Sequence, residues 1–277
     1  MHGDEKVPAL LLKKFERNSE VLQRPSFEKV FTLFANTRAF QENKRFIDCD
    51  LNRCFGFENL DAPKVNLLHE QQLAKQIYSR FQTWDIDLTI DCHSTSSAMG
   101  ITLILNSRHP YLLRLSALVS TLEPSIKILI FEPESEKNRL RELTELGLTV
   151  EIGCIPHNTF DSAWFKKLES LIHLLLDSIH KLNIGKSFSL PEQITCYEYV
   201  GSIDYPRAQN QEIIAGIHPQ VANFQQLERG DVLFVNLDTL TNIEYQGKKT
   251  VFPIFINESA YMKSVAALLT EKVKIVL

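Results

Sequence analysis

The 277-residue sequence has no hydrophobic run long enough to cross a membrane and no surplus of positive charge. Its hydrophobic runs, such as residues 101–105 and 126–131, fall far short of the roughly 18 residues that a spanning helix needs. Lys and Arg together number 30 against 34 Asp and Glu, which gives a net charge of −4. Broad binding to nucleic acid or to anionic membranes needs cations concentrated on one face, so neither partner is expected.

Cysteine is scarce and irregularly spaced. The five cysteines, at positions 49, 54, 92, 154 and 196, include no Cys-x-x-Cys pair. This pattern argues against a disulfide framework and against a zinc site built from four cysteines. Residues 1–30 lack the apolar core of a signal peptide. A cytoplasmic protein with reduced cysteines is therefore expected, and the pattern leaves homo-oligomer formation open.

Hydrophobic periodicity divides the chain into two parts. From residue 7 to about 182, short apolar runs alternate with helical patterns, which is typical of an α/β domain with a buried sheet. Beyond residue 186, short strands alternate with turn residues. The sequence thus predicts an α/β domain over residues 1–185 and a smaller β-rich domain over residues 186–277. The predicted strands are 30–35, 86–92, 101–105, 126–131, 148–153, 194–200, 213–217, 231–235 and 251–256, and the predicted helices are 67–81, 111–122 and 161–182.

Two distant segments carry residues that suit a metal ion. His2 and Glu5 lie three positions apart, close enough to hold one ion from a turn or a first helical residue. His93 stands at the carboxyl end of the predicted strand 86–92, the edge at which open α/β sheets bind ligands. Two histidines and one glutamate are a ligand set of catalytic zinc, with a fourth position left for water. Taken alone, His93 also fits a hydrogen-bonded loop histidine.

A cluster of cations follows in residues 45–53. Arg45, Asn52 and Arg53 lie among carboxylates there. Arginine is favoured for holding carboxylates because its guanidinium offers a fork of donors. A solvated charged loop gives the same pattern, since surface ion pairs are common and weak.

Three more residues are candidates for a cleft. Glu151 interrupts an apolar strand, where a carboxylate is costly unless it is paired or bound. It is a candidate general base beside a metal site, and pairing with a nearby Arg or Lys is the structural alternative. Tyr261 ends the stretch Asn-Glu-Ser-Ala-Tyr and is placed to present a phenol between two domains, and His157 is expected at the cleft mouth.

In chain order, these segments resemble the aspartoacylase and succinylglutamate desuccinylase family. The family pattern is a His-Gly-Asn-Glu turn, an Asp-x-Asn-Arg stretch, a strand ending in Asp-Leu-His and a Glu-Val-Gly strand. The corresponding residues are His2-Gly3-Asp4-Glu5, Asp50-Leu51-Asn52-Arg53, Asp91-Cys92-His93 and Glu151-Ile152-Gly153. The similarity covers nearly the whole chain and is greatest to the aspartoacylase branch, through residues 46–53, 204–207, 217–219 and 257–261.

The resemblance implies a zinc-carboxypeptidase-like mixed sheet with flanking helices, joined to a smaller C-terminal β-rich domain. It implies a zinc-dependent amidohydrolase that acts on linear amides. The expected substrate is N-acetyl-L-aspartate or a similar small N-acyl amino acid, cleaved to a carboxylate and a free amino acid. The alternatives are a deacylase of N-succinylglutamate or of N-acyl-aromatic amino acids, and a non-catalytic truncated relative.

The resemblance also assigns roles to single residues. One zinc ion per chain would be held by His2, Glu5 and His93. Glu151 would be the catalytic base, and Arg45 would face the developing oxyanion. The residues that would contact the substrate are Arg45, Asn52, Arg53, Arg141, Glu151 and Tyr261.

Three features depart from the family pattern. Asp4 replaces the usual Asn, which adds negative charge near the metal motif. Lys137 stands where animal aspartoacylases have a substrate-contacting Tyr, so selectivity for aspartate is less strictly implied. The sequence starts just before His2, whereas family members have a first strand and a Gly-Gly-Thr turn there. A sheet without that strand is therefore expected.

Overall fold

The computed structural model describes residues 2–61, 63, 65–131, 138–186, 189–261 and 265–277. Their helices are α1 (Lys6–Arg17), α2 (Thr37–Gln41), α3 (Phe57–Asp61), α4 (His69–Trp84), α5 (Pro110–Leu122) and α6 (Ser162–Asn183), with short 3-10 turns η1 (Ser19–Leu22), η2 (Leu51–Arg53) and η4 (Leu140–Leu143). The strands are β1 (Leu88–Ser94), β2 (Gly100–Leu105), β3 (Lys127–Ile130), β4 (Leu146–Gly153), β5 (Gln193–Asp204), β6 (Ala215–Ile217), β7 (Val232–Asn236), β8 (Asn242–Glu244), β9 (Phe252–Ile254) and β10 (Val265–Val276).

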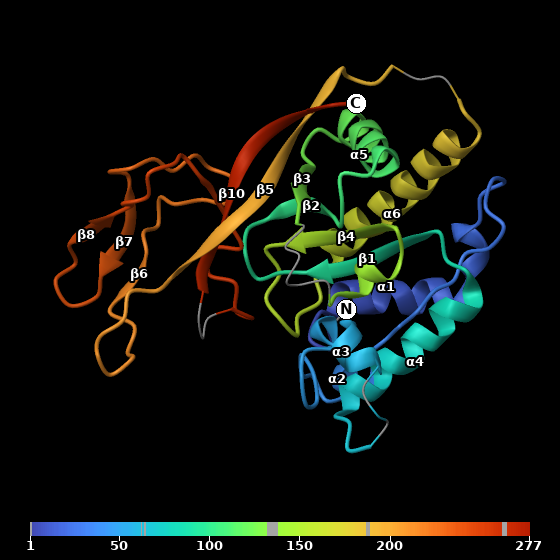
Figure 1. Cartoon of the computed structure of the whole chain (residues 1–277), viewed down its shortest axis with the longest axis horizontal. Coiled ribbons are helices and arrows are strands. Elements are labelled where there is room, and N and C mark those ends of the chain that lie inside the picture. Colours follow the sequence, from blue (N-terminus) through green and yellow to red (C-terminus); the bar gives the residue numbers. More distant parts are fainter. Residues whose placement is uncertain (1, 62, 64, 132–137, 187–188, 262–264) are drawn as a thin grey trace.

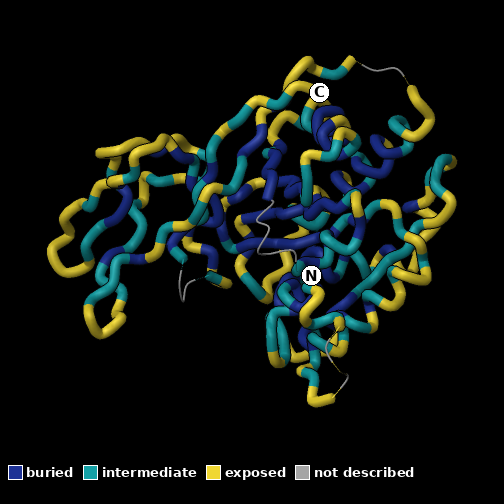
Figure 2. Tube along the Cα trace, viewed as in Figure 1, coloured by how far each residue is buried: buried dark blue, intermediate teal, exposed yellow. Residues whose placement is uncertain are grey.

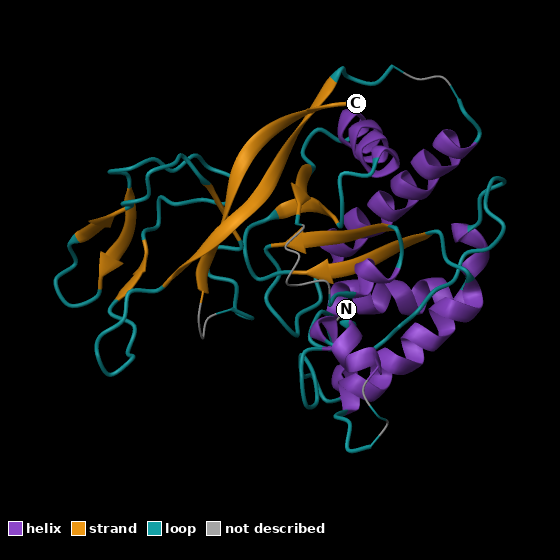
Figure 3. Ribbon diagram, in the orientation of Figure 1, coloured by secondary structure: helices purple, strands orange, loops and turns teal. Residues whose placement is uncertain are grey.

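The strands form one large and one small sheet. The large sheet has seven strands in the order β1-β4-β2-β3-β5-β10-β9, with both parallel and antiparallel neighbours. The small sheet has the order β6-β7-β8 and lies at the opposite end of the molecule from α1 and α4 (Figure 1). Figure 3 shows the long antiparallel pair of β5 and β10 between the small sheet and the helices. The expected fold class, a mixed sheet with flanking helices and a smaller β-rich part, is confirmed.

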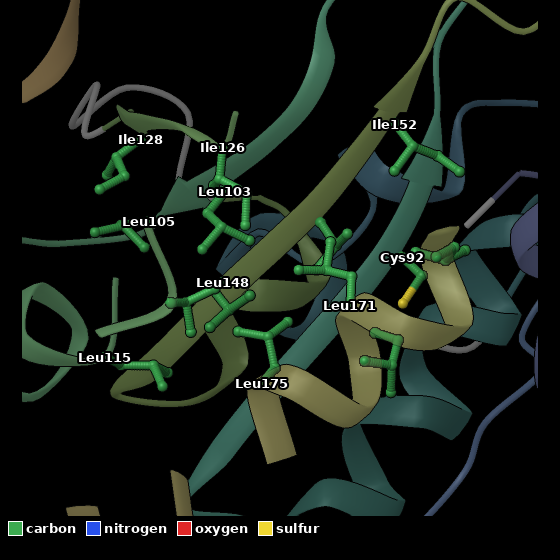
Figure 4. Packing of buried hydrophobic residues seen from close by; sticks show 14 of the residues in the cluster. Cys92, Leu103, Leu105, Leu115, Ile126, Ile128, Leu148, Ile152, Leu171 and Leu175 are labelled. Carbon is green, nitrogen blue, oxygen red and sulfur yellow. The ribbon is translucent and has the colours of Figure 1, made fainter. Parts of the chain in front are cut away.

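The main hydrophobic core lies between the large sheet and the helices α1, α5 and α6. Alternate residues of each strand point to one face of a sheet. Cys92 of β1, Leu103 of β2 and Leu148 of β4 point to the helix face and are buried in this core. Figure 4 shows Leu175 of α6 directed at the strands that carry Leu103 and Leu148. The opposite face is thus left for the polar residues of the same strands.

Three smaller clusters of apolar residues complete the interior. One joins α4 to the turns η2 and η4, one lies within the small sheet and its loops, and one lies on the face of the large sheet opposite the main core. Figure 2 shows the buried residues concentrated around β1, β2 and β4, while the exposed residues gather in loops and at the far ends. None of the helices in the described part of the chain is long and apolar enough to cross a membrane.

One predicted strand is wrong, and two long elements were not predicted. Residues 30–35 form no strand. Their side chains pack, as in the stack of Phe31 on Trp84 at 4.3 Å, but their backbone joins neither sheet. The unpredicted elements are α1, whose buried Val7, Leu11 and Phe15 recur at intervals of four residues, and β10, the longest partner of β5.

Candidate active site and metal centre

The polar face of β1 and β4 forms the floor of the candidate site. The two strands are parallel neighbours, with His93 paired in register to Glu151. Because side chains alternate along a strand, Asp91 and His93 of β1 share a face with Thr149 and Glu151 of β4. The helix side of these strands carries the apolar residues of the main core. The polar side chains therefore gather on one face of an otherwise apolar sheet.

Three buried side chains converge as a candidate metal centre. Donor atoms of His2, Glu5 and His93 all lie within 4.8 Å of one another. The Glu5 carboxylate is 2.7 Å from Nδ1 of His2 and 3.0 Å from Nδ1 of His93. His2 and Glu5 stand on the turn that leads into α1, with Glu5 at its N-cap position, and His93 lies near the end of β1. The two predicted segments thus meet in space.

Each histidine is oriented by a second carboxylate. Nε2 of His2 lies 2.8 Å from Oδ1 of Asp50, and Nε2 of His93 lies 2.8 Å from Oδ2 of Asp91. Metal-binding histidines are commonly held in this way, since a carboxylate on the far nitrogen fixes the ring and raises its basicity. Two Nδ1 atoms and one carboxylate that converge from such anchored side chains fit a zinc ion.

Charge in the centre is balanced by these contacts. Burial opposes ionisation of Glu5, but His93 and His2 hold its pKa well below the usual value. Burial also opposes protonation of His93, but the carboxylates of Asp91 and Glu5 outweigh it and raise the pKa of His93 to about 9. The site is therefore built to neutralise positive charge, which is what a divalent ion supplies.

Gly3 allows the metal turn, which is residues 2–5 with His2 and Glu5, to lie against the segment around Ala39. A Cβ atom at this position would be 2.3 Å from the carbonyl carbon of Ala39. The amide of Gly3 donates a hydrogen bond to the carbonyl of Arg45 at 3.1 Å. Any larger residue would push the turn away, so the glycine of the motif follows from this close approach.

Glu151 is a buried carboxylate beside the metal centre. Burial raises its pKa to about 8, and the carboxylates of Glu5 and Glu258 add to the rise, whereas His93 and Arg45 oppose it. A carboxyl group that titrates near neutral pH suits a group that must both accept and donate a proton.

An open pocket of about 630 Å³, including the solvent at its mouth, contains the site. It is lined by all the residues predicted for metal, catalysis and substrate, which are His2, Glu5, Arg45, Asn52, Arg53, His93, Arg141, Glu151 and Tyr261. Arg45 reaches the metal end, with Nη1 3.7 Å from Oε1 of Glu5 and Nη2 3.4 Å from Oδ2 of Asp50. Nη1 of Arg141 donates to the Thr149 hydroxyl at 3.3 Å. Lys137 lies outside the described residues.

Four further residues in or beside the pocket were given no role in the sequence analysis. Asp50 and Asp91 orient the two histidines. Both stand in motifs that carry the family resemblance, Asp50 at the start of Asp50-Leu51-Asn52-Arg53 and Asp91 two residues before His93. Arg139 and Glu258 also line the pocket. Glu258 belongs to the stretch 257–261 that carries part of the family resemblance, whereas no motif pointed to Arg139.

His157 lies between two carboxylates. Nδ1 is 2.8 Å from Oδ2 of Asp4, and Nε2 is 3.3 Å from Oε1 of Glu258. Glu258 in turn accepts hydrogen bonds from the Thr95 hydroxyl and from the amide of Ser96 at 3.0 Å. Hence His157 links the metal turn to the loop that carries Tyr261, a role different from the expected place at the pocket mouth.

Comparison with known proteins identifies the family of the chain. The family model of the succinylglutamate desuccinylase/aspartoacylase catalytic domain matches residues 1–179, and that of the AstE/AspA barrel-sandwich hybrid domain matches residues 192–273. A protein of Nostoc sp. named "Probable aspartoacylase" is 40% identical, with 98% of this chain and 93% of the relative covered. Aspartoacylase of Mus musculus is 33% identical, with 94% and 86% covered.

A solved structure extends the likeness to three dimensions. The crystal structure of murine aminoacylase 3 superimposes with a TM-score of 0.92 at 28% identity, and the match covers 99% of this chain and 93% of that one. Family models, relatives matched over most of their length and this structure all point to the same family. The chain belongs to the succinylglutamate desuccinylase/aspartoacylase family.

Proposed function

We propose that this protein is a zinc-dependent amidohydrolase that cleaves N-acetyl-L-aspartate or a closely similar N-acyl amino acid. The observation that carries the proposal is the convergence of His2, Glu5 and His93 within 4.8 Å beside the buried Glu151. Arginines line the same pocket, so a substrate with carboxylate groups finds cations there.

His2, Glu5 and His93 would hold the zinc ion. When bound, zinc would lower the pKa of water and polarise the acyl carbonyl. Glu151 takes one proton from the attacking water, whose oxygen adds to the carbonyl carbon. It then delivers that proton to the amide nitrogen as the carbon–nitrogen bond breaks. The carboxylic acid that forms passes its remaining proton to the freed amine or to solvent, so the products are the carboxylate of the acyl group and the free amino acid.

The surrounding residues bind and orient the substrate. Arg45, at the metal end of the pocket, is placed to stabilise negative charge that develops on the carbonyl oxygen. Asn52, Arg53, Arg141 and Tyr261 are proposed to contact the substrate carboxylates, as the family resemblance implies. We also propose a cytoplasmic location, because all five cysteines are free thiols.

The test pairs elemental analysis with product release on one purified sample. We expect close to one zinc per chain and release of acetate from N-acetyl-L-aspartate. A panel with N-succinyl-L-glutamate and N-acetyl-L-tyrosine decides the substrate. If kcat/KM for N-acetyl-L-aspartate does not exceed the others, the assignment to aspartate is wrong. Protein without zinc and without turnover would instead favour a non-catalytic relative.

A further inference from the structure

Asp4, at which the chain departs from the family pattern, is paired with His157, a residue to which the proposed function gives no role. Oδ2 of the buried Asp4 lies 2.8 Å from Nδ1 of His157. The carbonyl of Asp4 also accepts a hydrogen bond from the amide of Asn158 at 2.7 Å. The metal turn is therefore tied to the segment after β4 by a side chain and by the backbone. The negative charge that Asp4 adds near the metal motif meets an imidazole.

The second ring nitrogen of His157 faces another carboxylate. Nε2 lies 3.3 Å from Oε1 of the buried Glu258. Hydrogen bonds to Asp4 and Glu258 raise the pKa of His157 to about 10, although burial opposes the shift. At neutral pH both ring nitrogens therefore carry a proton, and each donates to one carboxylate. A neutral imidazole has one N–H and donates to only one of them.

Glu258 fixes two loops at the pocket. Its Oε2 accepts hydrogen bonds from the amides of Ser96 at 3.0 Å and Ser97 at 3.2 Å, in the loop that follows β1. Its Oε1 accepts from the amide of Ala260 at 3.1 Å, and its carbonyl accepts from the amide of Tyr261 at 2.9 Å. His157 thus joins the metal turn to the loop after β1 and to the loop that carries Tyr261.

We propose that His157 is a positioning residue that holds the metal turn, through Asp4, and the loop that carries Tyr261, through Glu258, in the arrangement that binds zinc and substrate. The inference rests on the proposed function and deepens it. Groups that orient metal ligands from outside affect metal affinity, although they do not bind the ion. A histidine that only stabilised the fold would lower the Tm and leave the zinc Kd of the folded protein unchanged.

The first test is a double-mutant cycle on zinc affinity. The zinc Kd is measured at pH 7, well below the Tm, by competition with a chelating dye. The proteins are the unmodified chain, His157→Ala, Asp4→Ala and Asp4→Ala/His157→Ala. His180→Ala is the matched control, because it removes a histidine of α6 that lies 2.9 Å from the hydroxyl of Ser26, outside the residues that line the pocket.

We expect His157→Ala to weaken zinc binding about 10-fold, as loss of an orienting contact predicts. His180→Ala should leave the zinc Kd within about 2-fold of the original. Since His157 acts on the metal turn through Asp4, the double variant should bind zinc at most about 2-fold more weakly than Asp4→Ala alone. An unchanged zinc Kd in His157→Ala, or effects of the two substitutions that multiply in the double variant, would overturn the proposal.

A binding measurement tests the contact with Glu258. Calorimetry of N-acetyl-L-aspartate compares zinc-saturated Glu151→Gln with zinc-saturated Glu151→Gln/His157→Ala. We expect His157→Ala to raise the Kd about 5-fold, because the loop that carries Tyr261 is then less well ordered before binding. Equal Kd values would contradict this part of the proposal. Absence of binding by Glu151→Gln would count against the proposed substrate, while the zinc cycle would still decide the role of His157.

Discussion

The pKa values of two buried carboxyl groups in one pocket are shifted in opposite directions. Glu5 has a lowered pKa because two histidines face it, whereas burial and neighbouring carboxylates raise the pKa of Glu151 to about 8. Such a split separates a group that stays ionised and binds charge from a group that exchanges protons. The environment of each residue, more than its type, sets the proposed roles.

Glu151→Gln is expected to separate catalysis from metal binding. The amide keeps the shape of the side chain but is unable to carry a proton, so kcat should fall about 100-fold or more. Zinc content should remain near that of the unmodified protein, because Glu151 is not among the converging donors. Acetate release and elemental analysis measure the two effects.

The control for this variant is Glu192→Gln, an exposed residue just before β5. Retention of more than about a tenth of the original kcat by Glu151→Gln would rule out its role as the base.

His157→Gln should change stability in a pH-dependent way. Hydrogen bonds to Asp4 and Glu258 raise the pKa of His157 to about 10, although burial opposes the shift. Because the folded-state pKa lies above the unfolded value of about 6.5, the stabilisation is complete below that pH. It is lost as the pH rises through about 10.

Urea denaturation checks this expectation. The difference in unfolding free energy between the unmodified protein and His157→Gln should be greatest near pH 6, on the order of 1–2 kcal/mol after allowance for solvent screening. It should shrink steadily as the pH approaches about 10. His69→Gln, at the start of α4, serves as control, and a difference that grows with pH would contradict the argument.

At the scale of elements, the first turn of one helix organises the loop that carries Arg45, the arginine proposed to stabilise the oxyanion. Glu70, in the first turn of α4, is fully buried and accepts hydrogen bonds from the amides of Ile47, Asp48 and Cys49 at 2.6, 3.0 and 3.2 Å. Burial opposes its ionisation, but these amides and that of the Asn36 side chain keep its pKa lowered. A single carboxylate thus holds the backbone between Arg45 and Asp50.

Glu70→Gln should loosen this loop. The side-chain amide of the new Gln places a donor where two or more backbone N–H groups need an acceptor. The free energy of unfolding should therefore fall by about 2–3 kcal/mol. Arg45 would lose its fixed position, so kcat/KM should fall by about 10-fold or more. Thermal unfolding and kinetics, with the exposed Glu58→Gln as reference, measure both; a neutral variant would show that the loop is held by other contacts.

The sequence predicted strands correctly where the apolar segment also has a neighbouring strand with which its backbone pairs. Strands β1, β2, β3 and β4 follow from continuous apolar runs because each pairs with a neighbour in the sheet. Residues 30–35 have an equally apolar sequence, but their backbone joins neither sheet. Strand formation needs a free edge beside the segment, and local composition does not report where such edges lie.

At the scale of the whole molecule, the pocket depends on contacts between distant parts of the chain. β10 pairs with β5, and β5 pairs with β3, so the large sheet continues past residue 186. β9 pairs with β10, and the loop with Glu258 and Tyr261 follows it. Because β9 belongs to this sheet, Glu258 and Tyr261 reach the pocket in which His2, Glu5 and His93 converge.

Removal of the metal should weaken the fold as a whole. The candidate ligands join the turn before α1 to β1, and a bound ion stabilises only the folded state. A chelator should therefore lower the Tm by roughly 5–10 °C, and added zinc should restore it.

His93→Ala is the matched control for chelation, because it already lacks one donor. Its Tm should respond little to chelator or to zinc. A chelator effect of equal size in this variant and in the unmodified protein would place the stabilising ion elsewhere.

The sequence alone determined the fold class, most strands of the large sheet and nine of the residues that line the pocket, because periodicity and sequence motifs are local properties. It did not determine how His2 and Glu5 meet His93 or that Asp50 and Asp91 orient the histidines. Nor did it determine that Arg139 lines the same pocket as Arg141. Those relations depend on strand order and on backbone approach, such as that of Gly3 to Ala39. Both are set by packing between residues far apart in the chain, so only the tertiary structure decides them.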